Sequence, residues 1–178
     1  MSRQEWLAAA LDVLSKEGEA KLRIDRLTAS LGVTKGSFYW HFTDRADFVR
    51  SLAEYWADSM TQTVVDEMTQ RRHIAPKEQL FHIAELVTRK NYGRYDIVMR
   101  AWAQNEPNVA PIVEQVDRAR HATVRRAFAK HGFRGEELEM RTRIFVGFFS
   151  IELGLLPRET QNQRRRRLKG KIRFFTKP

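Results

Sequence analysis

Two short amphipathic segments meet at a glycine near the start of the chain, and this arrangement constrains the fold more than any other feature. The first segment, Asp25–Leu31, ends directly before Gly32. The second, Lys35–His41, carries Phe38 and is followed by Phe42, so two aromatic rings four residues apart share one side of a helix. Because Gly32 can adopt the positive φ of a tight turn, the pattern predicts two crossed helices on a common apolar underside, a helix-turn-helix.

The outer side of the second segment is polar, which suits contact with a nucleic acid. Gly36 lets the backbone approach a duplex closely, and Thr34 can cap the helix. Contacts at the start of such a helix are what docking in the major groove of DNA needs. Tyr39 and Trp40 could instead be ordinary half-buried aromatics, but the glycine turn, the two phenylalanines and the polar side together favour groove docking. The side chains that can reach phosphate oxygens or base edges are Lys35, Ser37, Tyr39 and His41.

The net charge of +10 also invites a nucleic-acid interpretation, but the charge is unevenly placed. Residues 1–60 hold 8 basic and 9 acidic side chains, and residues 61–157 hold 15 and 12. Residues 158–178 hold 9 basic side chains and 1 acidic one. Most of the excess therefore lies in the C-terminal tail, and the prediction for the N-terminal segments depends on their pattern rather than on charge.

Apolar residues elsewhere recur at intervals of three and four, glycine and proline are sparse, and no segment alternates as a strand does. Gly18 marks the end of a first helix and Asp44 the start of a long one. The sequence therefore predicts an all-α fold. Further helices are expected from Asp44 towards Arg71, from Pro76 through Val87, around 97–102, from 108 to 130, and from Glu136 to Leu156, where Pro157 ends the helix.

The stretch LGVTKGSFYWHFTDRADFVRSL resembles the DNA-binding domain of the TetR family of transcriptional regulators, and the resemblance covers about residues 3 to 56. The family's turn, the small-residue start of its recognition helix and its aromatic run are present as Leu31-Gly32-Val33, Gly36-Ser37 and Tyr39-Trp40-His41-Phe42. The resemblance implies an N-terminal three-helix domain over residues 1–45. A helical ligand-binding and dimerisation domain would follow over residues 46–178, with a basic tail from about residue 158.

The resemblance also implies roles for individual residues. Trp40 is expected to pack at the edge of the recognition helix, and Arg45 to lie near a phosphate. The sequence departs from the family where Arg23 and Asp25 stand near the start of the first motif helix, where members often have threonine. Arg23 would add a phosphate contact, whereas Asp25 would oppose one. The groove and phosphate contacts implied by the resemblance are Thr34, Lys35, Gly36, Ser37, Tyr39 and His41.

A dimer interface is expected on part of the final helix and on one face of the helix from Glu136 to Leu156, and in the dimer these would close a four-helix bundle. Small residues within two turns of this helix would let a second backbone approach closely, and paired recognition helices must reach major grooves about 34 Å apart. The alternative is that this apolar helix packs only inside the monomer. The expected interface residues are Ile144, Gly147, Phe148, Ser150, Ile151 and Gly154.

A ligand pocket is expected among the helices of residues 76–130, with the long helix from Asp44 and the Phe145 helix as walls. An aromatic lining favours a flat apolar or amphipathic small molecule. The alternative for each residue is that it belongs to the core. The candidates are Tyr55, Trp56, Ile83, Met99, Trp102, Val113, Val116, Phe145 and Phe149.

Several classes of function find no support in the sequence. With no cysteine there is no thiolate metal site, and the His82–Glu85 spacing would need further ligands. No phosphate-binding loop or nucleophile elbow is present, so we expect no enzyme, no cofactor and no metal. We expect neither a signal peptide nor a membrane span, which favours the cytoplasm, in association with the nucleoid.

The function predicted from these features is a ligand-responsive repressor that binds a palindromic operator on double-stranded DNA as a homodimer. The alternative is a basic DNA-architectural or membrane-surface protein that acts through its arginine-rich tail. The tail, with Arg164–Arg167, could also be a solvated and partly frayed helix end. Its apolar residues could pack on the body or on a partner subunit, and these are Leu168, Ile172, Phe174 and Phe175.

Overall fold

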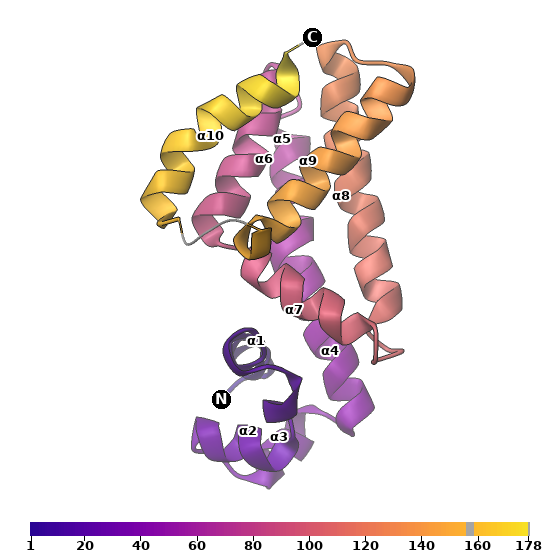
Figure 1. Cartoon of the computed structure of the whole chain (residues 1–178). Helices are drawn as coiled ribbons and strands as arrows, with labels where there is room; N and C mark the ends of the chain where they lie inside the picture. The colour runs from indigo at the N-terminus through magenta and orange to yellow at the C-terminus, as the bar shows by residue number, and fades with distance from the viewer. Residues whose placement is uncertain (156–158, 178) are drawn as a thin grey trace. The chain divides into compact units, whose positions relative to one another are not determined.

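The computed structural model describes residues 1–155 and 159–177, apart from the side chains of residues 153–155 and 161 (Figure 1). Within these residues every regular element is helical, as the sequence predicts. None of the described helices combines the length and the apolar content of a membrane span. The expected stop of the penultimate helix at Pro157 lies outside the described residues.

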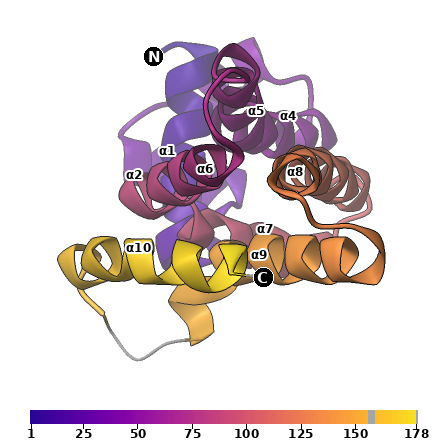
Figure 2. The same ribbon diagram turned by 90° about the horizontal axis from the view of Figure 1, so that it is seen from above.

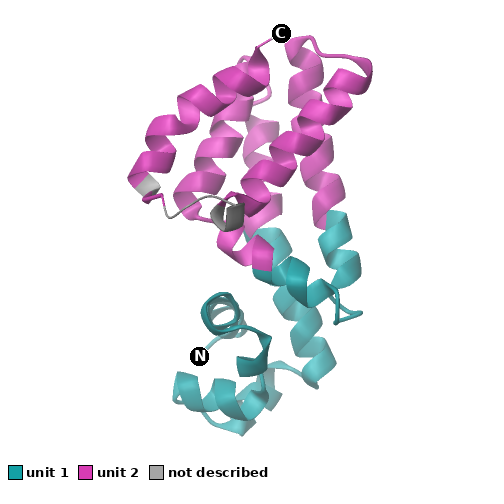
Figure 3. Cartoon of the chain, in the orientation of Figure 1, with its two compact units in different colours: residues 1–59, 98–115 teal, residues 60–97, 116–178 magenta. Residues whose placement is uncertain are grey.

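The chain forms two compact units, which Figure 3 shows in different colours. Unit 1 contains residues 1–59 and 98–115, and unit 2 contains residues 60–97 and 116–178. The expected domain boundary after Arg45 therefore does not coincide with the division into units. Helix α4 stays with unit 1 because it packs against α1 and buries Phe48, Leu52 and Trp56.

Unit 1 is built on an aromatic core. The ring of Trp6 meets those of Phe38 and Phe42 edge-on at 5.8 and 6.4 Å between centroids, and Phe48 lies 5.3 Å from Phe38. Leu27 is completely buried beside them. The N-terminal elements of this unit are α1 (Arg3–Glu17), the 3-10 turn η1 (Glu19–Lys21), α2 (Ile24–Leu31), α3 (Lys35–His41) and α4 (Arg45–Ala57).

The helix ends of unit 1 follow from local chemistry. Helix α1 ends at Gly18, whose φ is +80°, and α2 ends at Gly32 in the left-handed region. The Thr34 side chain accepts a hydrogen bond from the Ser37 backbone, and Asp44 caps α4. The caps predicted at these four positions are therefore confirmed.

The long helix expected from Asp44 to Arg71 contains an irregularity. A π-helical turn, η2 (Asp58–Gln62), stands between α4 and α5 (Thr63–Gln70). The backbone of Asp58 and of Gln62 is right-handed helical, so the helix continues through a widened turn. Such turns are rare and occur mostly as single widened turns inside α-helices, frequently at functional sites. In η2 the Thr61 hydroxyl accepts a hydrogen bond from the distant Arg120.

Unit 2 surrounds helix α6, which packs against α5, α9 and α10 (Figure 2). The basic tail forms most of α10, and its Leu168, Ile172 and Phe175 are buried, whereas Phe174 is 76% exposed. The tail is expected from the sequence to be either a frayed helix end or a segment packed on the chain or on a partner subunit. It packs on the chain itself, against α6. The remaining helices are α6 (Pro76–Lys90), α7 (Gly93–Ala103), α8 (Ala110–His131), α9 (Gly135–Leu155) and α10 (Gln161–Thr176), with α7 and α8 each contributing residues to both units.

Candidate functional site

Helix α3 has a rigid underside and an open outer side. Phe38 and Phe42 are buried in the aromatic core. Gly32, with φ 64° and ψ 31°, donates its N–H towards the carbonyls of Ala29 and Thr28, and this fixes the turn before α3. The helix is therefore held on one side only, and its polar side is available to a partner.

The outer side of α3 carries two exposed aromatic residues. Tyr39 is 57% exposed and its ring edge meets Phe38 at 5.3 Å, while Trp40 is 85% exposed. The expectation that Trp40 packs at the edge is wrong. Trp40 lies two residues from both buried phenylalanines, and at about 100° per residue it points away from the core.

Three expected DNA contacts also have partners inside unit 1. The Trp6 indole N–H donates to the Ser37 hydroxyl at 3.4 Å, and His41 Nε2 lies 2.8 Å from the Met1 carbonyl oxygen. The Arg45 guanidinium donates to Glu106 at 3.0 Å. These contacts orient side chains at both ends of α3 and at the start of α4. Sequence reasoning missed the Glu106 partner, since the Asn105-Glu106-Pro107 run indicated only a helix break.

Lys35 and Asp25 form an exposed ion pair, with Nζ and Oδ1 2.6 Å apart. The hydrogen bond and charge of Lys35 lower the pKa of the Asp25 carboxyl, and the same pair raises the pKa of Lys35. Arg23 precedes α2 as its N-cap residue, is exposed, and makes no side-chain cap. The first motif helix therefore brings a carboxylate next to the expected lysine contact.

A second candidate site is a cavity of about 50 Å³ inside unit 2. Three residues expected in a pocket, Ile83, Phe145 and Phe149, line it. Val116 belongs to unit 2 but is not among the lining residues. The other candidates are residues of unit 1 and do not line this cavity, because helical periodicity indicates burial but not the core in which a side chain is buried. They are Tyr55, Trp56, Met99, Trp102 and Val113.

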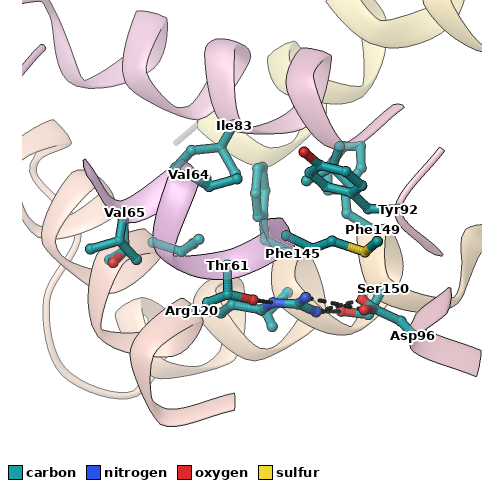
Figure 4. A pocket seen from close by; sticks show the side chains of 15 residues that line it. Thr61, Val64, Val65, Ile83, Tyr92, Asp96, Arg120, Phe145, Phe149 and Ser150 are labelled. Carbon is teal, nitrogen blue, oxygen red and sulfur yellow. Dashed lines mark hydrogen bonds and ion pairs between the residues drawn. The ribbon is translucent and has the colours of Figure 1, made fainter. Parts of the chain in front are cut away.

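One end of the cavity is polar, and sequence reasoning missed it (Figure 4). Arg120 of α8 pairs with Asp96 of α7, with Nη2 3.1 Å from Oδ1. The same guanidinium donates to the Thr61 hydroxyl at 2.8 Å and to the Ser150 hydroxyl at 3.4 Å. Asp96 is 1% exposed. The available signal was a single carboxylate, Asp96, in a helical segment whose other charged residues are the arginines Arg94 and Arg100.

The outer side of α9 is partly apolar. Ile144 is 50% exposed, Gly147 is exposed, and Phe148 and Ile151 are half-buried. Ser150, also expected at a dimer interface, instead lies inside unit 2, because its position in α9 faces Arg120. The surroundings of the remaining interface candidate, Gly154, lie outside what the structure describes.

No group of three potential metal-ligating side chains occurs among the described residues. His82 Nδ1 lies 3.9 Å from Glu85 Oε2, as an isolated pair on α6.

Comparison with known proteins places the N-terminal segment in a family. Residues 7–52 match the profile of the bacterial regulatory proteins of the tetR family. The transcriptional regulator AcrR of Shigella flexneri is 34% identical over 55 residues, which is 31% of this chain and 24% of that protein. AcuR of Cereibacter sphaeroides is 31% identical over 70 residues, 37% of this chain and 32% of that protein. The matched part therefore spans less than a third of either relative.

The fold of the whole chain resembles that of solved regulators. A transcriptional regulator from Rhodococcus sp. Rha1 has a TM-score of 0.77 at 16% identity, covering 98% of this chain and 96% of that one. A TetR-family regulator from Bordetella parapertussis has a TM-score of 0.74 at 15% identity, covering 97% and 93%. The N-terminal segment therefore matches the profile of the tetR family of bacterial regulatory proteins, and the whole chain shares its all-helical fold with solved transcriptional regulators, including one of the TetR family.

Proposed function

We propose that the chain is a repressor that binds a palindromic operator as a homodimer and leaves it when a small molecule occupies the cavity of unit 2. It would act in the cytoplasm, on the nucleoid. The observation that carries this proposal is the exposed polar side of α3 on a rigid aromatic underside. Such a helix can enter the major groove without reorganising its own core.

Gly36 supports close approach of a duplex. A Cβ added at this position would meet only the Thr34 hydroxyl oxygen, at 3.6 Å, which is ordinary contact. The protein itself therefore does not require glycine here, although glycine weakens a helix. A partner that comes close to the backbone would require it. The proposed DNA-contacting residues are Arg23, Thr34, Lys35, Gly36, Ser37, Tyr39, Trp40, His41 and Arg45.

The homodimer is proposed to use the outer side of α9. Met140, one turn before Ile144, is 52% exposed, and Phe174 of α10 is 76% exposed. Exposed apolar side chains on neighbouring turns are typical of an interface that is incomplete in one copy. The proposed contacts are Met140, Ile144, Gly147, Phe148, Ile151 and Phe174.

The effector is proposed to bind in the cavity of unit 2. A structure with a similar fold, a transcriptional regulator from Saccharomonospora viridis, was solved in complex with choline, with a TM-score of 0.68 and 17% identity. An effector can shift the chain between DNA-binding and released states only by its different affinity for the two. The separation of the two recognition helices in the dimer would differ between these states.

The proposal is tested by fluorescence anisotropy on palindromes found in the DNA flanking the gene. Lys35→Ala with Tyr39→Ala should abolish binding to the preferred palindrome, because both side chains lie on the outer side of α3. A matched variant neutralises three exposed cations of α10 by Arg165→Gln, Lys169→Gln and Arg173→Gln, and should keep the preference. DNA binding that survives Lys35→Ala with Tyr39→Ala but is lost in the α10 variant would favour the second candidate, a basic DNA-architectural or membrane-surface protein. This candidate is supported by the charge of residues 158–178.

A further inference from the structure

An open groove lies between α6 and α10, which pack side by side in unit 2 (Figure 1). It has a volume of about 600 Å³. Its apolar part consists of the half-buried ring of Phe81 and the side chain of Ile172, which is 2% exposed. No residue lines both this groove and the cavity proposed for the effector, so the two are separate features of unit 2.

The rim of the groove is basic. Lys77 of α6 and Lys169 and Arg173 of α10 line the groove and are exposed. Within the described residues none of these three side chains forms an ion pair or a side-chain hydrogen bond, whereas Lys171 of the same helix pairs with Glu152. Lys169 and Arg173 are four residues apart in α10, so their like charges repel each other along the helix. An acidic partner would compensate these charges.

Gly170 lies between the two cations of α10, and the fold of the chain does not require a glycine there. The residue is exposed, its backbone is helical without a positive φ, and a Cβ added to it would meet no atom within 4 Å. Glycine weakens a helix relative to alanine. A solvated basic surface needs no glycine, whereas a partner that approaches the backbone of α10 closely does.

The same features distinguish between classes of partner. Glu78 also lines the groove, where its carboxylate would repel a continuous row of phosphates, and an apolar surface adds nothing to phosphate binding. A membrane surface would need the apolar side chains of α10, but Leu168 and Ile172 are buried in unit 2. A two-fold contact with a second copy would place this basic patch against itself. A protein segment with carboxylates and an apolar side chain matches both parts of the groove.

We propose that the groove between α6 and α10 binds an acidic segment of a partner protein. Carboxylates of the segment pair with Lys77, Lys169 and Arg173. One apolar side chain of the segment packs on Phe81, and the backbone of the segment passes Gly170. This inference goes beyond the proposed function, because it concerns neither the DNA-contacting residues nor the effector cavity.

The probe for the test is a short synthetic peptide in which glutamates surround one central leucine. It is titrated into the full chain while the amide signal of Gly170 and the methyl signals of Ile172 are followed by nuclear magnetic resonance. We expect saturable shifts with a Kd of about 0.1–1 mM, because exposed ion pairs and one partly buried side chain each contribute little. The absence of saturable shifts overturns the proposal.

Two matched peptides test the two parts of the groove. One carries glutamine in place of glutamate, and the other carries serine in place of leucine. Each should bind at least about threefold more weakly than the probe, since one lacks the ion pairs and the other lacks the apolar contact. If either control peptide binds as tightly as the probe, the corresponding contact is wrongly assigned and the proposed partner class fails.

Variants of the chain locate the binding site. Gly170→Leu places a side chain in the groove and should abolish binding without weakening α10, because leucine is a better helix former than glycine. Lys77→Gln with Arg173→Gln should weaken binding about threefold or more. The matched control, Arg165→Gln with Arg166→Gln, removes two exposed charges of α10 that do not line the groove and should change the affinity by less than about twofold. Equal losses in the two charge variants would show a general attraction to a basic helix and would contradict the proposal.

Other classes of partner give different results in the same measurement. A DNA duplex without the palindrome, or vesicles of phosphatidylserine, could shift the Gly170 and Ile172 signals more strongly than the peptide at an equal concentration of negative charge. Either result overturns the choice of a protein segment. Shifts of these signals on dilution of the chain alone would assign the groove to a second copy and overturn it as well. None of these outcomes depends on operator binding, which fluorescence anisotropy measures separately.

Discussion

Arg45, the first residue of α4, donates a hydrogen bond from Nη1 to Oε2 of Glu106, 61 residues further along the chain, at 3.0 Å. The Glu106 side chain is 10% exposed, and its other oxygen accepts from the Asn108 amide at 3.2 Å. A second carboxylate, Glu19, lies 3.7 Å from Arg45. The guanidinium that the family resemblance assigns to a phosphate therefore also joins α4 to the turn before α8 within unit 1.

A double-mutant cycle should measure this pair. Arg45→Gln and Glu106→Gln should each lower the free energy of unfolding, with a coupling between them of about 0.5–1.5 kcal/mol, because one partner is buried and the other half-exposed. Urea unfolding followed by tryptophan fluorescence reports on unit 1, which contains Trp6, Trp40, Trp56 and Trp102. Strictly additive effects would show that the contact adds nothing to stability.

Gly36→Ala should separate stability from DNA binding. The new methyl group meets only the Thr34 hydroxyl oxygen at 3.6 Å, so alanine should leave the fold intact or stabilise it by up to about 1 kcal/mol. Binding to the preferred palindrome should weaken at least about tenfold, because the methyl group would occupy the space of the approaching duplex. Gly170→Ala, a substitution in α10 with open space around it and outside the proposed DNA and dimer contacts, is the control and should not change DNA affinity.

The features that the sequence predicted well are local ones. The turn at Gly32, the caps at Thr34 and Asp44 and the inward direction of Phe38 and Phe42 depend on residues within one or two helical turns. The types and spacings of these neighbouring residues are enough to predict the features, and the structure confirms each of them. The exposed Trp40 could also have been predicted from its spacing, but the expectation for it came from resemblance instead.

The features that the sequence did not predict depend on distant partners. Thr61 bonds to Arg120 across 59 residues, and Asp96 pairs with Arg120 across 24. Nothing in the spacing of these residues indicates that three helices bring them to one cavity. For the same reason the predicted pocket combined Trp102 with Phe145, although these residues belong to different units.

Asp25→Asn should strengthen DNA binding. In the structure the Asp25 carboxylate is 2.6 Å from the Lys35 ammonium group and compensates its charge. Without the carboxylate, Lys35 does not have to break an ion pair in order to contact a phosphate. The affinity for DNA should therefore rise about twofold to fivefold at low salt and less at high salt. The companion variant Lys35→Gln should weaken binding and reduce the salt slope by about 0.9. Weaker binding by Asp25→Asn would indicate that Asp25 positions Lys35 productively.

Asp47 should make the stability of unit 1 pH-dependent. The Thr43 backbone N–H, followed by Ser51 and Arg3, lowers the pKa of its carboxyl. Because the folded pKa lies below the unfolded one, the stabilisation is present above the unfolded value of about 3.9 and is lost as the pH falls through the folded value. Asp47→Asn should therefore cost about 1 kcal/mol near neutral pH and nothing in strong acid. Urea unfolding at both pH values measures this, and a cost that does not change with pH would contradict it.

The buried side of α10 should matter for stability, and its exposed cations should not. Leu168 and Ile172 are each 2% exposed in the packing of α10 on α6, so Leu168→Ala should lower the free energy of unfolding of unit 2 by about 2–4 kcal/mol. Removing the tail altogether would expose the same apolar surface of α6, and any loss of DNA binding after truncation would then report unfolding rather than a missing contact. Lys169→Gln, one residue from Leu168 on the exposed side, is the matched control and should change stability by less than about 0.5 kcal/mol. Thermal unfolding followed by circular dichroism distinguishes the two, and an equal loss in both variants would show that the charge of α10, rather than its packing, stabilises unit 2.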